Sequence, residues 1–203
     1  MNALLEPLPP HEAQAIEALR AAMDRAGSAF DFAVHRVPAQ AGPVGEAHHR
    51  AALQGLFESF AAAWPALRFD LGQAVATPLD AQAVMPAAHF PPGWRVDHTR
   101  DPARVSWFEW LAQAFDDPPY TLRWCEDPET HAWLFPRFCA CTGLMRGEGI
   151  EVLDWVGDPE RDPGRSEWSD YFEAGKEWWG IWCLTVWNPR HRTLAAMAAS
   201  TTD

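Results

Sequence analysis

Several stretches of the chain carry apolar residues at the spacing of a helix with one buried face. In residues 11–26 this repeat follows two prolines and ends at a glycine, a common helix stop. Residues 46–64 show a similar stripe, and a proline ends it. An Asp-Pro pair opens the third stretch, residues 101–115, as an N-cap followed by a first-turn proline. We predict helices at these three positions and a shorter helix over residues 166–174.

Other stretches alternate apolar and polar residues with the period of a strand. The predicted strands cover residues 30–35, 67–71, 120–124, 131–144, 150–156, 179–187 and 193–200, with residues 81–84 as a further candidate. The run 179–187 is apolar on both faces, which indicates a central strand. In the run 193–200, alanines leave space for tryptophan rings. We therefore predict one α+β domain over residues 1–203, with N-terminal helices and a mostly antiparallel sheet in the second half that helices cover.

Net charge narrows the classes of partner. The chain has 28 acidic and 16 basic side chains, which leaves a net charge of −12. Binding to phosphates depends on clustered Lys and Arg, so we expect neither nucleic acid nor an anionic membrane surface as a partner. The N-terminal residues lack the basic and apolar regions of a secretory signal, and the apolar runs fall short of the about 20 residues that span a bilayer. We therefore expect a cytoplasmic protein.

Cysteine and histidine positions bear on metal binding and catalysis. The soft ligands that lie near one another in sequence are Cys125, His131, Cys139 and Cys141. A Cys-x-Cys pair in an apolar strand does not match the turn-borne pairs of zinc sites, so we predict free thiols, no metal and no cofactor. The adjacent His48 and His49 point apart on a helix and are expected to face solvent. We find no motif for nucleophilic catalysis and predict no catalytic residue.

Acidic and aromatic residues concentrate in residues 148–177, which we call the acidic segment. Ten acidic and three basic side chains give it a net charge of −7. Negative charge steers association with a basic partner, and aromatic side chains are common anchors at protein interfaces. The opposing interpretation is a solvated acidic surface over a tryptophan core. As a protein-binding face we predict Trp155, Asp158, Glu160, Asp162, Trp168, Asp170, Tyr171, Glu173 and Glu177.

The same residue types suggest an alternative from another class. Sugar sites combine flat aromatic faces with paired carboxyl groups that act as acid and base or nucleophile. The acidic segment contains both types, and so does the stretch of residues 124–133. A small carbohydrate-active enzyme or a glycan-binding module is therefore the alternative to a non-enzymatic protein-binding domain.

The C-terminal sequence carries a family resemblance. The run EWWGIWCLTVW at residues 177–187, a turn, and the ending AASTTD at residues 198–203 resemble the C-terminal hairpin of some small bacterial immunity proteins. These are cytoplasmic antitoxins that neutralise polymorphic or secreted toxins. The resemblance covers about the last thirty residues. It implies a non-enzymatic inhibitor that blocks a toxin by binding it, and here the acidic face would meet a basic toxin.

Overall fold

The computed structural model describes residues 4–81, 90, 94–97, 99, 105–118, 128–176 and 179–201, with only the backbone described for 128–131. Its helices are α1 (Pro10–Ala26), α2 (Glu46–Ala63), α4 (Trp107–Asp116) and α5 (Pro128–Thr142). Its strands are β1 (Phe30–Arg36), β2 (Thr77–Leu79), β3 (Glu151–Asp154), β4 (Ile181–Asn188) and β5 (Thr193–Ser200). Short 3-10 turns are η1 (Ala39–Ala41), η4 (Pro163–Ser166), η5 (Asp170–Phe172) and η6 (Ala174–Lys176).

The strands form one antiparallel sheet in the order β1-β5-β4-β3-β2. Strand β4 lies at the centre, and all of its residues from Ile181 to Trp187 are buried, as the apolar run predicts. Strand β5 returns beside it in a hairpin, with Trp182 opposite Ala199 and Trp187 opposite Leu194. The α+β class and the antiparallel sheet are confirmed.

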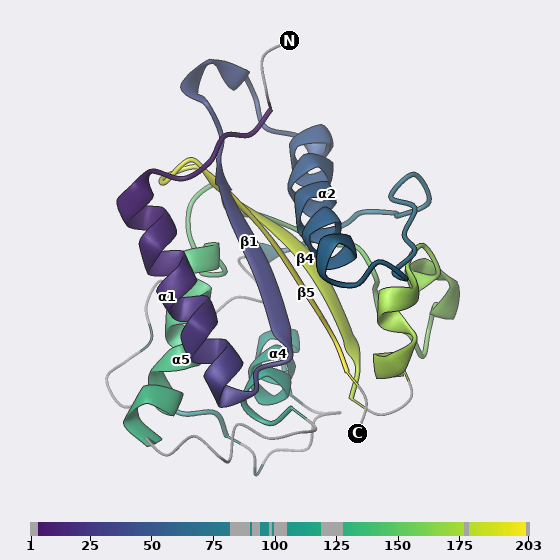
Figure 1. Ribbon diagram of the computed structural model, residues 1–203. Coiled ribbons are helices and arrows are strands. Elements are labelled where there is room, and N and C mark those ends of the chain that lie inside the picture. The colour runs from purple at the N-terminus through teal and green to yellow at the C-terminus, as the bar shows by residue number, and fades with distance from the viewer. Residues whose placement is uncertain are drawn as a thin grey trace.

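Helices cover both faces of this sheet (Figure 1). Helices α1, α4 and α5 lie on one face, where Phe30, Phe138 and Trp182 belong to a single buried cluster. Helix α2 and the chain after β3 lie on the other face, where Phe57 and Trp155 are fully buried. The protein therefore has three layers, with the sheet in the middle.

The alanines of β5 serve both faces. Ala195 and Ala199 belong to the cluster under α1, α4 and α5, whereas Ala196 and Ala198 belong to the cluster under α2. All four are fully buried. Small side chains let a helix lie close to the sheet, which suits the direct packing of α2 on β5. The space that these small side chains leave is therefore used by helix α2 as well as by a tryptophan ring such as Trp182.

The predicted helix boundaries hold for α1 and α2 and shift for α4. Gly27 ends α1 in the left-handed conformation, at φ 74°. Helix α4 begins at Trp107, and its cap is Ser106, whose hydroxyl accepts a hydrogen bond from the Glu109 N–H. Residues 105 and 106 precede the helix, so within the described residues the helix starts later than the Asp-Pro pair predicts. The Asp-Pro pair itself, in residues 101–104, lies outside the described part.

The largest correction concerns residues 131–144: residues 131–142 belong to α5 and not to a strand, and residues 143–144 follow the helix. Leu134, Phe135, Phe138 and Cys139 are buried, and their spacing is that of one helix face. Pro136 lies inside this helix without ending it, although proline is unfavourable at an interior helix position.

Smaller corrections concern the loops. Residues 67–71 are irregular and carry one isolated bridge, from Phe69 to Ser169, instead of a strand. Residues 82–84 of the candidate strand at 81–84 lie outside the described part, and a short strand that the sequence did not predict, β2, precedes them. The helix expected over 166–174 is a series of separate 3-10 turns, and the strand predicted at 120–124 lies outside the described residues. Within the described chain, no helix has both the length and the apolarity to cross a bilayer.

Candidate protein-binding surface

The acidic segment contains β3, and its part after β3 packs on the α2 face of the sheet. Over its described residues, 148–176, nine acidic and three basic side chains give a net charge of −6. The exposed carboxylates are those of Glu148, Glu151, Asp158, Glu160, Asp162, Glu167 and Glu173. Glu177 lies outside the described residues. Of the six acidic residues in the predicted face, Asp158, Glu160, Asp162 and Glu173 are therefore exposed, whereas Asp170 is partly buried.

Three of these carboxylates lie on one exposed loop, residues 157–165, which we call the acidic loop. Asp154 starts it, because its Oδ1 accepts the N–H groups of Val156 and Gly157, both at 3.0 Å. Asp158 then accepts the Glu160 N–H at 3.0 Å and forms an ion pair with Arg161 at 3.2 Å. These local bonds fix the direction of the loop and leave Glu160 and Asp162 exposed.

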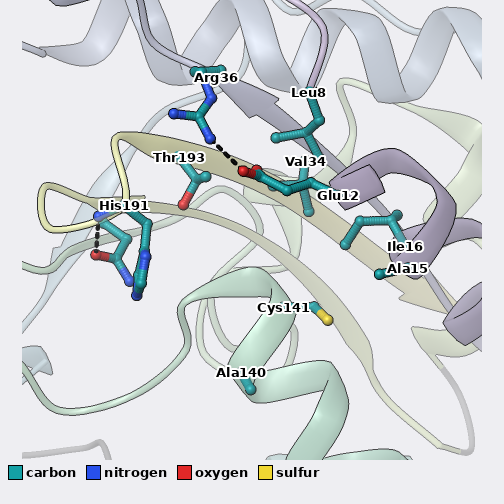
Figure 2. Close-up of a pocket in the computed structure, with 11 residues that line it drawn as sticks. Leu8, Glu12, Ala15, Ile16, Val34, Arg36, Ala140, Cys141, His191 and Thr193 are labelled. Carbon is teal, nitrogen blue, oxygen red and sulfur yellow. Dashed lines mark hydrogen bonds and ion pairs between the residues drawn. The ribbon is translucent and has the colours of Figure 1, made fainter. Parts of the chain in front are cut away.

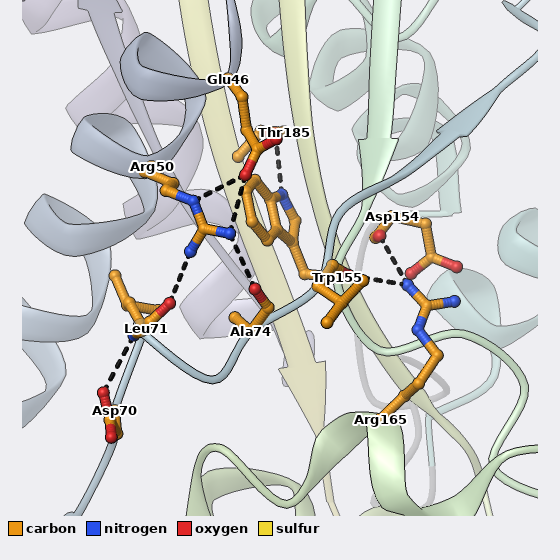
Figure 3. Close-up of polar contacts among 11 residues, drawn as sticks. Glu46, Arg50, Asp70, Leu71, Ala74, Asp154, Trp155, Arg165 and Thr185 are labelled. Carbon is orange, nitrogen blue, oxygen red and sulfur yellow. Dashed lines mark hydrogen bonds and ion pairs between the residues drawn. The ribbon is translucent and has the colours of Figure 1, made fainter.

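Arg165 ties the acidic loop to the rest of the protein (Figure 3). Its Nη2 donates to the carbonyl oxygens of Val75 and Asp154, both at 2.9 Å. Gly157 makes room for this guanidinium: its φ is +66°, and a Cβ there would lie 2.6 Å from Arg165 Nη1. The loop thus needs glycine at this position for two independent reasons.

The tryptophans of the predicted face fill the core instead. Trp155 is 0% exposed and Trp168 is 3% exposed. The Trp155 indole N–H donates to Thr185 Oγ1 at 2.9 Å, and the Trp168 indole N–H donates to the Trp155 carbonyl at 3.1 Å. Neither ring presents a face to a partner, so the expectation that these two rings act as surface anchors is corrected. Single-sequence reasoning could not separate the two cases, because interfaces and cores both favour tryptophan.

Asp170 binds the loop at Arg68, and Tyr171 packs against helix α2. The Asp170 carboxylate accepts the Arg68 N–H at 2.9 Å and lies 3.1 Å from Arg68 Nε. Tyr171 stacks on Phe60 with ring centroids 4.9 Å apart and an angle of 8° between the planes. Burial raises the pKa of Tyr171 well above its usual value. Of the predicted residues, Asp158, Glu160, Asp162 and Glu173 remain as exposed contacts for a partner.

Arg50 is a residue that the sequence did not single out. Its guanidinium lies over the Trp155 ring, 5.1 Å from the centroid, and donates to Glu46 at 2.8 Å and to the Ala74 carbonyl at 2.8 Å. Together with Arg68 and Arg165 it binds residues 68–76 to the acidic segment. Three of the sixteen basic side chains therefore stabilise the support of the acidic loop.

His48 and His49 are buried, contrary to the expected solvated face. His49 is 1% exposed, and its Nδ1 lies 2.8 Å from the Thr185 hydroxyl. Desolvation, and then the neighbouring His48, lower the pKa of His49 to about 4, while Glu46 opposes the shift. A threonine in the middle of an otherwise apolar central strand was the available signal, because a buried hydroxyl requires a partner.

The described residues offer no arrangement for catalysis that we can identify. Burial raises the pKa of Cys139 and Cys183 well above the usual value, so these thiols stay protonated. Within the described ranges, no group of three or more metal-binding side chains is close enough to hold an ion. The sugar-binding alternative loses its stacking rings at Trp155 and Trp168, although Trp133 on α5 is 56% exposed. Comparison with protein-family models, with curated proteins and with solved structures found no match.

Proposed function

We propose that this chain is a non-enzymatic, cytoplasmic protein-binding domain that neutralises a basic toxin through its acidic loop. The observation that carries the proposal is the exposure of Asp158, Glu160 and Asp162 on a loop that Arg165 and Asp154 hold in place. Negative charge on one face accelerates encounter with a positive partner. A loop that is already ordered loses less conformational freedom on binding, so more of the interaction free energy remains for affinity.

The class of partner rests on the resemblance of the C-terminal run to bacterial immunity proteins. Immunity proteins act by occupying their toxin and need no catalytic group of their own. Many toxins that act on nucleic acid carry a basic surface, because phosphate binding requires Lys and Arg. An acidic inhibitor can cover such a surface, and the net charge of −12 supports this role.

The test is binding to the product of the neighbouring gene, since immunity genes lie beside their toxin genes. The test variant replaces Asp158→Asn, Glu160→Gln and Asp162→Gln. The association rate constant should fall and its dependence on salt should weaken, because exposed charges act mainly on the rate of encounter. The dissociation rate constant should change less. Stopped-flow or surface-based kinetics at two salt concentrations measures both rates.

A matched control separates the acidic loop from net charge. Glu17→Gln, Asp24→Asn and Glu58→Gln remove the same number of exposed charges from α1 and α2. This control should retain most of the association rate of the unmodified protein. Equal slowing in both variants would assign the effect to overall charge, and unchanged rates would place the binding face elsewhere. Turnover of a glycan by the unmodified protein would replace this proposal with the enzyme alternative.

A further inference from the structure

A pocket lies on the opposite face of the sheet from α2, where the N-terminal half of α1, the end of α5 and the β4–β5 turn meet (Figure 2). Its volume is about 240 Å³. Pockets for drug-sized ligands usually have about 300–1,000 Å³, so this one suits a smaller molecule. The acidic loop contributes none of its lining residues.

The polar part of the pocket contains a pair of opposite charges. Glu12 Oε1 and Arg36 Nη2 are 2.6 Å apart, and their side chains are 35% and 31% exposed. Among the described residues, the Arg36 guanidinium makes its hydrogen bond only through Nη2, and its Nε is buried without a partner. The pair is therefore reachable from solvent, and the guanidinium has donors that are not in use.

Further donors lie beside this pair, on the β4–β5 turn. The Asn188 side-chain oxygen accepts the N–H groups of Arg190 and His191, at 3.1 and 3.3 Å. Its oxygen is occupied in this way, so the amide nitrogen is the group that it can offer a ligand. Thr193 is the strand partner of Asn188 and also lines the pocket, and Figure 2 shows Thr193 and His191 on the same side of it.

The remaining wall is apolar. Leu8, Ile16 and Val34 lie together on the side away from His191 (Figure 2). The Cys141 sulfur lies on the floor of the pocket, and burial raises the pKa of this thiol. A protonated thiol behaves as a small apolar group, so Cys141 extends the apolar wall.

We propose that this pocket binds a free α-amino acid with a short apolar side chain. The ligand's ammonium group pairs with Glu12, and its carboxylate pairs with Arg36 and the Asn188 amide. The apolar side chain lies against Leu8, Ile16 and Val34. A zwitterion suits a pocket that already contains one charge of each sign, because each protein charge exchanges its partner and none is left unpaired. A ligand with a single charge would leave Glu12 or Arg36 without a partner.

The test uses L-leucine and three close analogues in isothermal titration calorimetry. L-Leucinamide lacks the carboxylate, N-acetyl-L-leucine lacks the ammonium group, and glycine lacks the side chain. L-Leucine should bind with a dissociation constant on the order of 1 mM or below, as expected for so few atoms. Each analogue should bind at least about tenfold more weakly, because each loses a charge-assisted hydrogen bond or the apolar contact.

Variants connect this selectivity with the charge pair. Glu12→Gln should reduce the affinity for L-leucine by about tenfold or more. Glu17→Gln is the matched control, because Glu17 lies on the same helix and pairs with Arg20, outside the pocket. Circular dichroism and thermal unfolding confirm that both variants are folded. If Glu12→Gln fails to fold, Arg36→Lys takes its place. Lysine keeps the positive charge but loses the planar fork of the guanidinium, so this variant should also weaken binding.

A second readout does not depend on heat of binding. Among the described cysteines, Cys139 and Cys183 are fully buried and Cys141 is partly exposed. L-Leucine should slow the alkylation of Cys141 by iodoacetamide, as followed by peptide mass spectrometry, and L-leucinamide should not. The proposal is overturned if L-leucine does not bind, if L-leucinamide binds equally well, or if Glu17→Gln lowers affinity as much as Glu12→Gln.

Discussion

Acidification should destabilise this protein through the buried histidine His49. The reason is a difference in proton binding between the folded and unfolded states. In the unfolded chain the His49 pKa takes its usual value near 6.5, whereas burial and His48 lower it to about 4 in the folded protein. Between these values the unfolded state binds one proton more than the folded state, so stability falls as the pH falls.

The magnitude follows from the two pKa values. Lowering the pH from 7 to 5 protonates His49 almost completely in the unfolded chain and only slightly in the folded one. The resulting loss of unfolding free energy is about 2 kcal/mol, and it grows until the pH reaches about 4. The unfolding free energy of a typical domain is only about 5–15 kcal/mol, so a loss of about 2 kcal/mol is easily measured.

The assay is urea denaturation at pH 7 and at pH 5, with unmodified protein and His49→Gln. Glutamine keeps a hydrogen-bonding group near Thr185 but takes up no proton. Asp31, whose pKa desolvation and Asp24 raise to about 6, titrates in the same range, and the comparison of the two proteins cancels its contribution. The stability difference between the proteins should change by about 2 kcal/mol from pH 7 to pH 5. A difference that stays constant within about 0.5 kcal/mol would refute the reasoning.

Other substitutions test the core and the loop. Trp182→Ala should lower the unfolding free energy by about 3–5 kcal/mol in urea denaturation, because Trp182 is 3% exposed and its ring centroid lies 4.2 Å from that of Trp110. A loss under about 1 kcal/mol would contradict its central place in the sheet. Gly157→Ala should cost about 1–3 kcal/mol, since alanine is strained at φ +66°, and an unchanged melting temperature would argue against the fixed loop. Thiol titration in denaturant without reductant should count four cysteines, and a lower count would indicate a disulfide.

The elements that the sequence predicted are those with a long and regular pattern. Helices α1 and α2 have an apolar stripe with clear ends, and β4 is a strand-forming run from which a turn leads back into the small residues of β5. The strand prediction for α5 was wrong because the apolar residues there are dense enough to fit the period of a strand as well as that of a helix. Pro136 also argued against a helix, because proline is unfavourable inside one. Local pattern decides such a stretch poorly, since the packing of Phe138 on Phe30 and Phe32 comes from distant parts of the chain.

The candidate surface was predictable in its charge and not in its aromatic residues. Burying an unpaired carboxylate is strongly unfavourable, so the many Asp and Glu residues of the acidic segment could be predicted to lie at the surface. Trp168 has no such constraint, and its burial depends on Phe57 from α2. The same limit applies to His49, whose partner Thr185 lies on a strand far along the chain. Contacts between distant segments are what a single sequence leaves open.

The position of β5 has a consequence for the order of events during synthesis. Strand β1 lies near the start of the chain, yet its neighbour in the sheet is β5. Phe30 can therefore pair with Ala199 only after β5 has been synthesised. An emerging chain exposes the edge of β1 and its apolar residues until β5 has left the ribosome. Pairings between such distant residues are also slow to form, because a long loop must close first. Strand β1 therefore depends on β5 to complete its pairing, and chaperones can reach β1 throughout the synthesis of the residues between them.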